Sequence, residues 1–110
     1  MQIIEEKQDD VFIFKVSGRL DSNTSPLLEE KISGAIADGS NHMIIDFENL
    51  DYLSSAGLRV LLKTTKMLKN ENGRLVLCSL ADYVREVFEI SGFDTFLPIV
   101  GTCDDALKEF

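Results

Sequence analysis

Two adjacent serines, Ser54 and Ser55, are the side chains of this sequence that are best placed for chemistry. Ala56 and Gly57 follow them, and an amphipathic helical pattern begins at the same point. The first turn of a helix has unpaired backbone N–H groups and the positive end of the helix dipole, so it stabilises an anion. A phosphate on Ser55, which adds roughly −1.5 to −2 charges, would therefore be held there without rearrangement of the fold.

The repulsion from such a phosphate would act on a molecule that docks against it. At an effective dielectric constant near 20, two like unit charges about 5 Å apart repel by roughly 3 kcal/mol. This energy corresponds to about a hundredfold in affinity. Ser55 is thus a candidate switch for binding, although a serine at a helix start is, on local sequence alone, usually only an N-cap.

A second polar cluster precedes the first predicted helix. It consists of Asp21, Ser22, Asn23 and Thr24, and Pro26 suits the first helical turn that follows. Asp21 is interpreted equally well as a contact residue for a partner and as a cap or turn residue. The other three side chains are more often turn residues than contact residues.

Hydrophobic periodicity predicts the elements that position these clusters. The chain opens with a hairpin, whose turn is formed by Gln8-Asp9-Asp10, and continues with alternating strands and helices. Strands are predicted at 2–6, 11–16, 43–47, 75–78 and 96–100. Helices are predicted from 26 to about 39, from 55 to about 72, from 79 to about 92 and from 102 to 110. Pro98 confines the last strand to a sheet edge, because proline cannot donate a ladder hydrogen bond.

Three of the predicted helices carry a clear apolar face. These faces are Leu28, Ile32, Ala35 and Ile36 in the first helix, Leu58, Leu61, Leu62, Thr65 and Leu68 in the second, and Val84, Val87, Phe88 and either Ile90 or Phe93 in the third. The third helix is expected to start with a Ser-x-x-acid capping pattern at Ser79 and to stop at Gly92. The strand at 43–47 is nearly all apolar, which is typical of a strand with helices on both sides. The sequence therefore predicts an α/β fold with a mixed sheet and helices packed against it.

Two segments of the chain resemble the signature segments of STAS domains. Gly18-Arg19-Leu20-Asp21 follows the second predicted strand, and Leu53-Ser54-Ser55-Ala56-Gly57-Leu58-Arg59-Val60-Leu61-Leu62 follows the third. The second segment is fairly specific, because a serine-bearing start of small residues coincides with an amphipathic leucine helix. The likeness covers essentially the whole chain, so residues 1–110 are expected to form one STAS domain of the stand-alone anti-sigma factor antagonist type.

This resemblance implies a regulator of transcription that works by partner switching. The unmodified protein would bind an anti-sigma factor or a related serine kinase of the histidine-kinase-like ATPase fold, and so release a sigma factor or another target. Ser55 would be the phosphoacceptor, and a serine phosphatase would reset the switch. The implied partner-binding residues are Asp21, Ser22, Asn23, Thr24, Ser54, Ala56, Gly57 and Arg59.

Two residues depart from the pattern of the family. Ser54 stands where many members have an aspartate directly before the phosphoserine, which matters for a kinase that reads that acid. Arg59 stands where the sporulation-type members have a glycine, and it adds a cation to the surface that a partner would cover. Both departures bear on which partner the protein accepts.

Composition disfavours several other classes of protein. With 19 acidic and 11 basic residues the formal net charge is −8, which repels nucleic acids and anionic membranes. No apolar run is long enough for a membrane helix and the N-terminus is acidic, so we expect a cytoplasmic protein. Cys78 and Cys103 are far apart in sequence and match neither a disulfide framework nor a metal motif. We therefore expect two reduced thiols, with Cys78 in the core, and neither a metal nor a cofactor.

No catalysis is predicted either. The single histidine, His42, lies at the opposite end of the third strand from Ser55, and there is no nucleophile elbow. A response-regulator receiver with Asp46 as acceptor is disfavoured, because its acidic pair should follow the first strand, where this chain has a hairpin. The remaining alternative is a constitutive interaction module, such as the soluble STAS subunit of a transport or signalling assembly, in which Ser55 is never phosphorylated.

Overall fold

The computed structural model describes all 110 residues. Its elements, in chain order, are β1 (Gln2–Gln8), β2 (Val11–Leu20), α1 (Ser25–Ala37), β3 (His42–Asp46), β4 (Leu50–Leu53), α2 (Ser55–Asn70), β5 (Arg74–Cys78), α3 (Asp82–Ser91), the 3-10 helix η1 (Phe93–Thr95), β6 (Ile99–Val100) and α4 (Cys103–Leu107).

The strands form one mixed sheet of six strands, which confirms the predicted α/β class. The order is β1-β2-β3-β5-β6; β1 runs antiparallel to β2, and the other neighbours along this path are parallel. β4 pairs in parallel with only the last three residues of β2, Gly18 to Leu20, and the register shifts between Gly18 and Arg19. The carboxyl ends of β2 and β4 therefore lie side by side.

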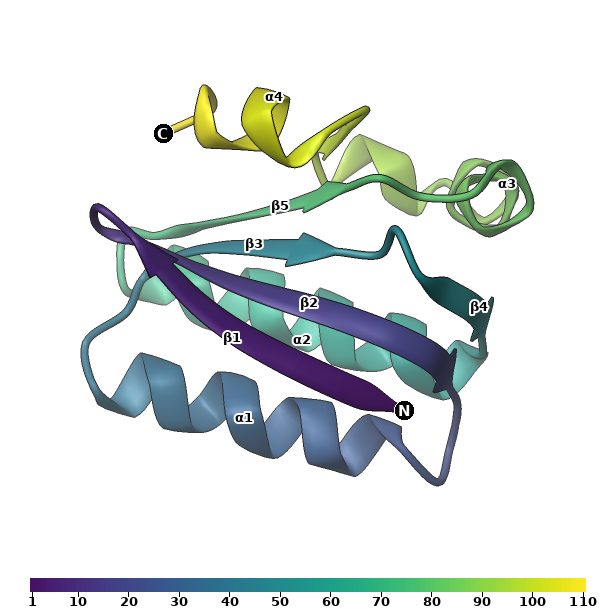
Figure 1. Ribbon diagram of the computed structural model, residues 1–110, viewed down its shortest axis with the longest axis horizontal. Coiled ribbons are helices and arrows are strands. Elements are labelled where there is room, and N and C mark those ends of the chain that lie inside the picture. The colour runs from purple at the N-terminus through teal and green to yellow at the C-terminus, as the bar shows by residue number, and fades with distance from the viewer.

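Helices cover both faces of this sheet. Figure 1 shows α1 and α2 next to each other on one face and α4 on the other face, above β5. The larger core, which includes Phe14, Phe47 and Leu61, involves α1 and α2, whereas a smaller core with Ile44 and Val76 contains Ala106 of α4. All apolar residues of β3 are buried, as expected for a strand between two layers.

The first two helices agree closely with the sequence. In α1 the side chains of Leu28, Ile32 and Ala35 are buried, and the helix is followed by Gly39 with a φ of 96°. In α2, Leu58, Leu61 and Leu68 are buried, whereas Leu62 and Thr65 of the predicted apolar face are half-buried. These two helices hold the polar clusters in place.

The prediction for α3 was partly wrong. Ser79 does not cap this helix; it has a φ of 61°, and α3 starts only at Asp82, after an N-cap residue, Ala81, that makes no side-chain bond. Val84 and Phe88 are buried as predicted and Gly92 ends the helix, but Val87 is 36% exposed. Of the two alternatives for the last core residue, Ile90 is 80% exposed and Phe93 packs against the core. Val84 and Phe88 are the only residues of α3 that are buried.

Two strands also differ from the prediction. The sequence indicated no strand between β3 and α2, where β4 lies, because only Leu50 and Leu53 of its four residues are buried. The predicted strand at 96–100 is reduced to β6, an edge strand of two residues, and Phe96 is 60% exposed. Pro98 precedes this strand, and its carbonyl oxygen accepts a hydrogen bond from the N–H of Leu77.

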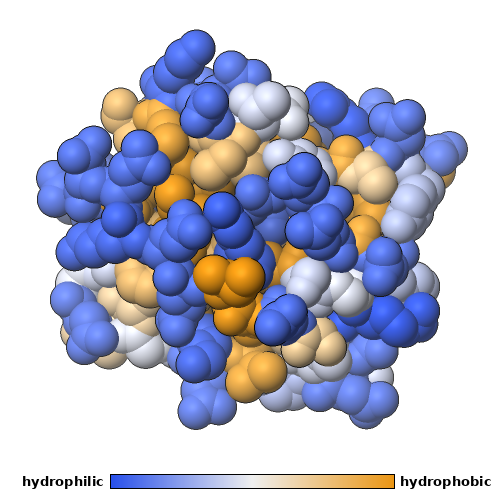
Figure 2. Space-filling view, in the orientation of Figure 1, coloured by the Kyte–Doolittle hydropathy of each residue, from blue (hydrophilic) through white to orange (hydrophobic).

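The surface is mainly polar on the side shown in Figure 2. Figure 2 shows a mainly hydrophilic face on which the hydrophobic patches are separate from one another. No helix of the structure combines the length and the apolar character that a membrane crossing requires.

Candidate functional site

Ser55 is the first residue of α2, and its side chain is exposed to solvent. Its hydroxyl makes no hydrogen bond to another protein group. The preceding residue, Ser54, is the N-cap, with extended backbone at φ −95° and ψ 172°, and its Oγ accepts a hydrogen bond from the N–H of Gly57 at 3.4 Å. The two serines thus divide the roles that the sequence left open: Ser54 caps the helix and Ser55 presents a free hydroxyl.

Gly57 has a structural reason to be glycine. A Cβ atom at this position would lie 2.7 Å from Cδ1 of Leu53 and 2.9 Å from Cγ of Leu20, far inside van der Waals contact. The missing side chain lets the first turn of α2 rest directly on the ends of β2 and β4. Gly57 is buried, so it supports the first turn of α2 and is not part of the exposed surface that a partner could contact.

The Asp21 loop is a closed turn between β2 and α1. Oδ1 of Asp21 accepts hydrogen bonds from the N–H groups of Asn23 (2.9 Å) and Thr24 (3.1 Å). The hydroxyl of Thr24 accepts from the N–H of Asp21 at 2.9 Å and donates to the carbonyl oxygen of Arg19 at 2.8 Å. The bond from the Asn23 N–H, followed by those from Thr24 and the charge of Arg19, lowers the pKa of Asp21. Asp21 therefore acts as a turn residue, and Ser22 and Asn23 are exposed at the tip.

A backbone contact joins this loop to the start of α2. The N–H of Ser54 donates to the carbonyl oxygen of Leu20 at 2.9 Å, at the point where Leu20 and Leu53 are partners in the parallel β2–β4 pair. The Asp21 loop and the Ser55 helix start consequently leave the sheet at neighbouring strand ends. The family resemblance implied that both segments contribute to one partner-binding surface, and the structure brings them side by side.

Arg19 and Tyr52 extend this surface. The guanidinium of Arg19 lies 4.2 Å from the centre of the Tyr52 ring and 3.8 Å from Oδ2 of Asp21. Both side chains are exposed, Tyr52 by 41%. Tyr52 was not predicted as a site residue, and its role depends on the register of β4, which the sequence did not indicate.

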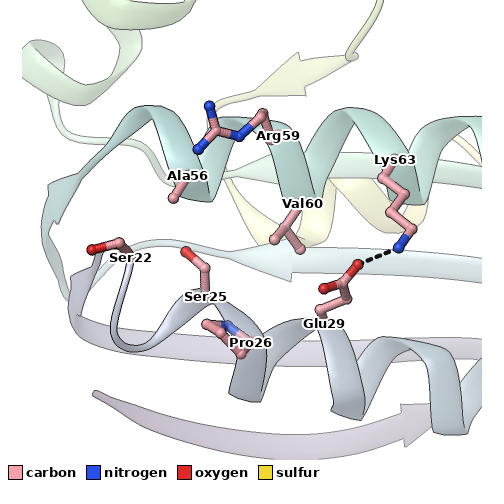
Figure 3. Close-up of a pocket in the computed structure, with 8 residues that line it drawn as sticks. All are labelled: Ser22, Ser25, Pro26, Glu29, Ala56, Arg59, Val60 and Lys63. Carbon is pink, nitrogen blue, oxygen red and sulfur yellow. Dashed lines mark hydrogen bonds and ion pairs between the residues drawn. The ribbon is translucent and has the colours of Figure 1, made fainter.

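A shallow groove of about 380 Å³ separates the first turns of α1 and α2. Its lining residues are Ser22, Ser25, Pro26, Glu29, Ala56, Arg59, Val60 and Lys63. Figure 3 shows Ser22, just before α1, and Ser25, at the start of α1, across the groove from Ala56 and Arg59 of α2. Farther along the groove, Lys63 forms an ion pair with Glu29. The sequence predicted only Ser22, Ala56 and Arg59 of this set, because the packing of α1 on α2 could not be inferred from periodicity.

Arg59 is exposed and forms no ion pair. It stands four residues after Ser55 on the same helix, a spacing that makes two side chains neighbours on one helix face. An unpaired cation therefore lies one helical turn from the free hydroxyl.

The sequence and the structure are both similar to those of known proteins. A family model described as the STAS domain matches residues 2–106. A Bordetella bronchiseptica protein, BtrV, named as a candidate anti-sigma factor antagonist, is 38% identical over 110 residues, which cover 100% of this chain and 95% of that protein. The crystal structure of an anti-sigma factor antagonist from Mycobacterium paratuberculosis has a TM-score of 0.90 at 31% identity and covers 98% of this chain and 92% of that one. The structure of the Bacillus cell fate determinant SpoIIAA in its phosphorylated form has a TM-score of 0.77 at 25% identity and covers 98% of both chains.

Proposed function

This chain belongs to the STAS domain family, and from that premise we propose that it is an anti-sigma factor antagonist whose binding is controlled by phosphorylation of Ser55. The observation that carries the proposal is the exposed Ser55 hydroxyl at the start of α2, which has no hydrogen-bond partner in the protein. The names of the relatives, one of them described in a phosphorylated form, favour this reading over a constitutive interaction module.

The proposed docking surface combines the Asp21 loop with the start of α2. Its members are Asp21, Ser22, Asn23, Thr24, Ser54, Ser55, Ala56 and Arg59. Gly57 is omitted because it is buried, and Arg19 and Tyr52 are added because they flank the loop and are exposed. An anti-sigma factor that covers this surface would be brought directly over the Ser55 hydroxyl.

The proposed cycle has two chemical steps. A serine kinase of the histidine-kinase-like ATPase fold, either the anti-sigma factor itself or a relative, transfers the terminal phosphoryl group of ATP to Oγ of Ser55 and releases ADP. A serine phosphatase then hydrolyses the ester with water, which restores the hydroxyl and releases inorganic phosphate. We infer no catalytic role for this chain, since its only histidine, His42, lies at the amino end of β3, opposite the strand ends that carry Ser55.

The fold can accept the phosphate where it forms. The backbone N–H groups of Ser55 and Ala56 precede the first intrahelical bonds and have no acceptor in the protein, so they are free to bind phosphate oxygens. Arg59 is one turn away and can pair with the same group. The modified protein would thus keep its structure, whereas an acidic partner group about 5 Å away would be repelled by roughly 3 kcal/mol per pair of unit charges.

A capture experiment tests this proposal. Wild-type protein and Ser55→Asp are immobilised and exposed to extract of the native cell, and retained proteins are identified by mass spectrometry. The wild type is expected to retain an anti-sigma factor with an ATPase fold, and Ser55→Asp to retain much less of it. Ser55→Ala is the matched control: it is expected to bind like the wild type and to take up no phosphate from the kinase and ATP. Equal retention by all three proteins would argue for a constitutive module.

A further inference from the structure

Three side chains that are distant in sequence meet on the sheet face opposite α1 and α2. Asp46 ends β3, Cys78 ends β5, and Cys103 is the first residue of α4. A carboxylate oxygen and the two Sγ atoms all lie within 4.8 Å of one another. Asp46 and Cys78 are register partners in the β3–β5 pair, and α4 folds back over β5 to bring Cys103 onto them (Figure 1).

The arrangement buries an acid that forms no ion pair. Asp46 is only 6% exposed, and its Oδ1 accepts one hydrogen bond, from the N–H of Glu48 at 2.9 Å. Its register partner on β2, Lys15, pairs with Glu6 at 3.3 Å and makes no ion pair with Asp46. A buried carboxylate usually has a direct charged partner, and this one lies beside two thiols instead.

The two cysteines supply two sulfur ligands for a cation that prefers sulfur. Cys78 is fully buried, and Cys103 is half-buried. The thiolate is the form of cysteine that binds a metal ion. Sulfur ligands exclude Mg²⁺ and Ca²⁺, which prefer oxygen, and favour Zn²⁺.

The cluster can be reached from solvent. A groove of about 380 Å³ borders it, lined by Asp46, Glu48, Ser79, Gly101, Thr102, Cys103 and Asp104. The carboxylates of Glu48 and Asp104 would attract a divalent cation to this entrance. The groove also leaves room for water to occupy a fourth coordination position.

We infer that Asp46, Cys78 and Cys103 form a binding site for Zn²⁺, with a water molecule from the groove as the fourth ligand. In tetrahedral zinc sites the metal–sulfur distance is about 2.3 Å and the metal–oxygen distance about 2.0–2.2 Å, so the ligand atoms lie less than about 4 Å apart. The cluster needs only a small contraction to reach that spacing. On binding, each thiol releases its proton to solvent, and the metal joins the ends of β3 and β5 to α4.

The site is separate from the docking surface. Ser55 begins α2, whereas α4 covers the opposite face of the sheet (Figure 1). The metal would stabilise α4, a helix of only five residues, without contacting the phosphoacceptor. Zinc binding and phosphorylation of Ser55 can therefore be tested independently.

Cobalt titration of the full chain tests the inference. The protein is kept reduced with a phosphine, its two free thiols are verified with a thiol reagent, and Co²⁺ is added as a spectroscopic probe. We expect one equivalent to produce a sulfur-to-cobalt charge-transfer band and the visible bands of tetrahedral Co²⁺, and Zn²⁺ but not Mg²⁺ to displace it. Cys103→Ser and Asp46→Asn should each weaken binding by more than about tenfold, whereas Asp38→Asn, which alters an exposed acid at the end of α1, should leave it unchanged.

Several results would overturn the inference. One is the absence of a charge-transfer band in the reduced wild-type protein. Another is a band of equal strength in Cys103→Ser, a variant that is expected to fold because this side chain is only half-buried at a helix start. A Cys78–Cys103 disulfide that survives the phosphine would likewise contradict it, because no thiolate would remain for the metal.

Discussion

The backbone N–H of Ser54 donates a hydrogen bond to the carbonyl oxygen of Leu20 at 2.9 Å. This one contact joins the end of β2 to the start of α2, so the loop that begins at Asp21 and the helix that begins at Ser55 emerge side by side. The remaining functional groups of Ser54 serve the helix, since its Oγ and its carbonyl oxygen accept from Gly57 and Leu58. The Ser55 hydroxyl makes no structural hydrogen bond, so substitutions of the two serines should have different effects.

The first prediction distinguishes the structural role of Ser54 from the proposed phosphoacceptor role of Ser55. Ser54→Ala removes the N-cap acceptor and should lower the free energy of unfolding by about 1 kcal/mol. Ser55→Ala removes an exposed hydroxyl without a partner and should change it by less than about 0.5 kcal/mol. Urea denaturation measures both values. Phosphate uptake from the kinase and ATP, followed by intact mass, should show the reverse pattern, with uptake lost only in Ser55→Ala.

The second prediction concerns the close approach at Gly57. Gly57→Ala should lower the free energy of unfolding by about 1–3 kcal/mol, because the new Cβ would overlap with Leu53 and Leu20. Gly34→Ala is the matched control in α1, where a Cβ meets nothing within 4 Å. That control should be stabilising by about 0.5–1 kcal/mol, since alanine is the better helix former. A stable Gly57→Ala protein would mean that the start of α2 does not rest on the strand ends.

The third prediction concerns Arg59 and the phosphate. In the phosphorylated protein, the guanidinium one turn after Ser55 should stabilise the dianionic form of the phosphate. The pKa of the phosphoserine, followed by ³¹P NMR, should therefore be higher in Arg59→Ala than in the wild type. Lys66→Ala, which removes an exposed cation three turns from Ser55, serves as the control. Identical titration curves for Arg59→Ala and the wild type would show that Arg59 does not contact the phosphate.

The fourth prediction is a pH dependence that arises from Asp21. The pKa of this carboxyl in the folded protein lies below its ordinary value of 3.8, mainly because of the hydrogen bond from the Asn23 N–H. The unfolded chain therefore binds the proton more tightly, and the stability that Asp21 provides is present above pH 3.8 and is lost as the pH falls through the folded value.

Thermal denaturation as a function of pH tests this dependence. The wild type should be more stable than Asp21→Asn near pH 6, and the difference should shrink as the pH falls below 3.8. Asp38→Asn, at an exposed position after α1, should show no comparable pH-dependent difference. A difference between wild type and Asp21→Asn that stays constant over this range would contradict the assignment.

Local patterns in the sequence predicted much of this fold and its site. The leucine stripe and the small residues before it predicted α2 with Ser55 at its start. Both patterns can be recognised because their residues are close together in the sequence. The two polar clusters were correctly expected on one surface, although that expectation came from a family resemblance. Asp21 was left open between turn and contact; the hydrogen bonds that its Oδ1 accepts from Asn23 and Thr24 show the turn role, and the contact role stays a prediction.

Features that depend on tertiary packing could not be predicted in this way. β4 contains only four residues and pairs with the end of β2, so it gives no detectable period. Ser79 looked like a helix cap, yet its left-handed backbone redirects the chain and leaves Ile90 exposed. Cys78 and Cys103 are 25 positions apart, and only the fold of α4 over β5 brings them together.

The central claim is that a phosphate on Ser55 strongly weakens partner binding while the fold stays intact. Its most direct test is isothermal titration of the captured anti-sigma factor with unmodified protein and with protein phosphorylated at Ser55, both verified by intact mass. We predict that phosphorylation weakens the affinity by about a hundredfold, with no change in the circular dichroism spectrum. Equal affinities for the two forms, or phosphate found on Ser54 instead, would contradict the account.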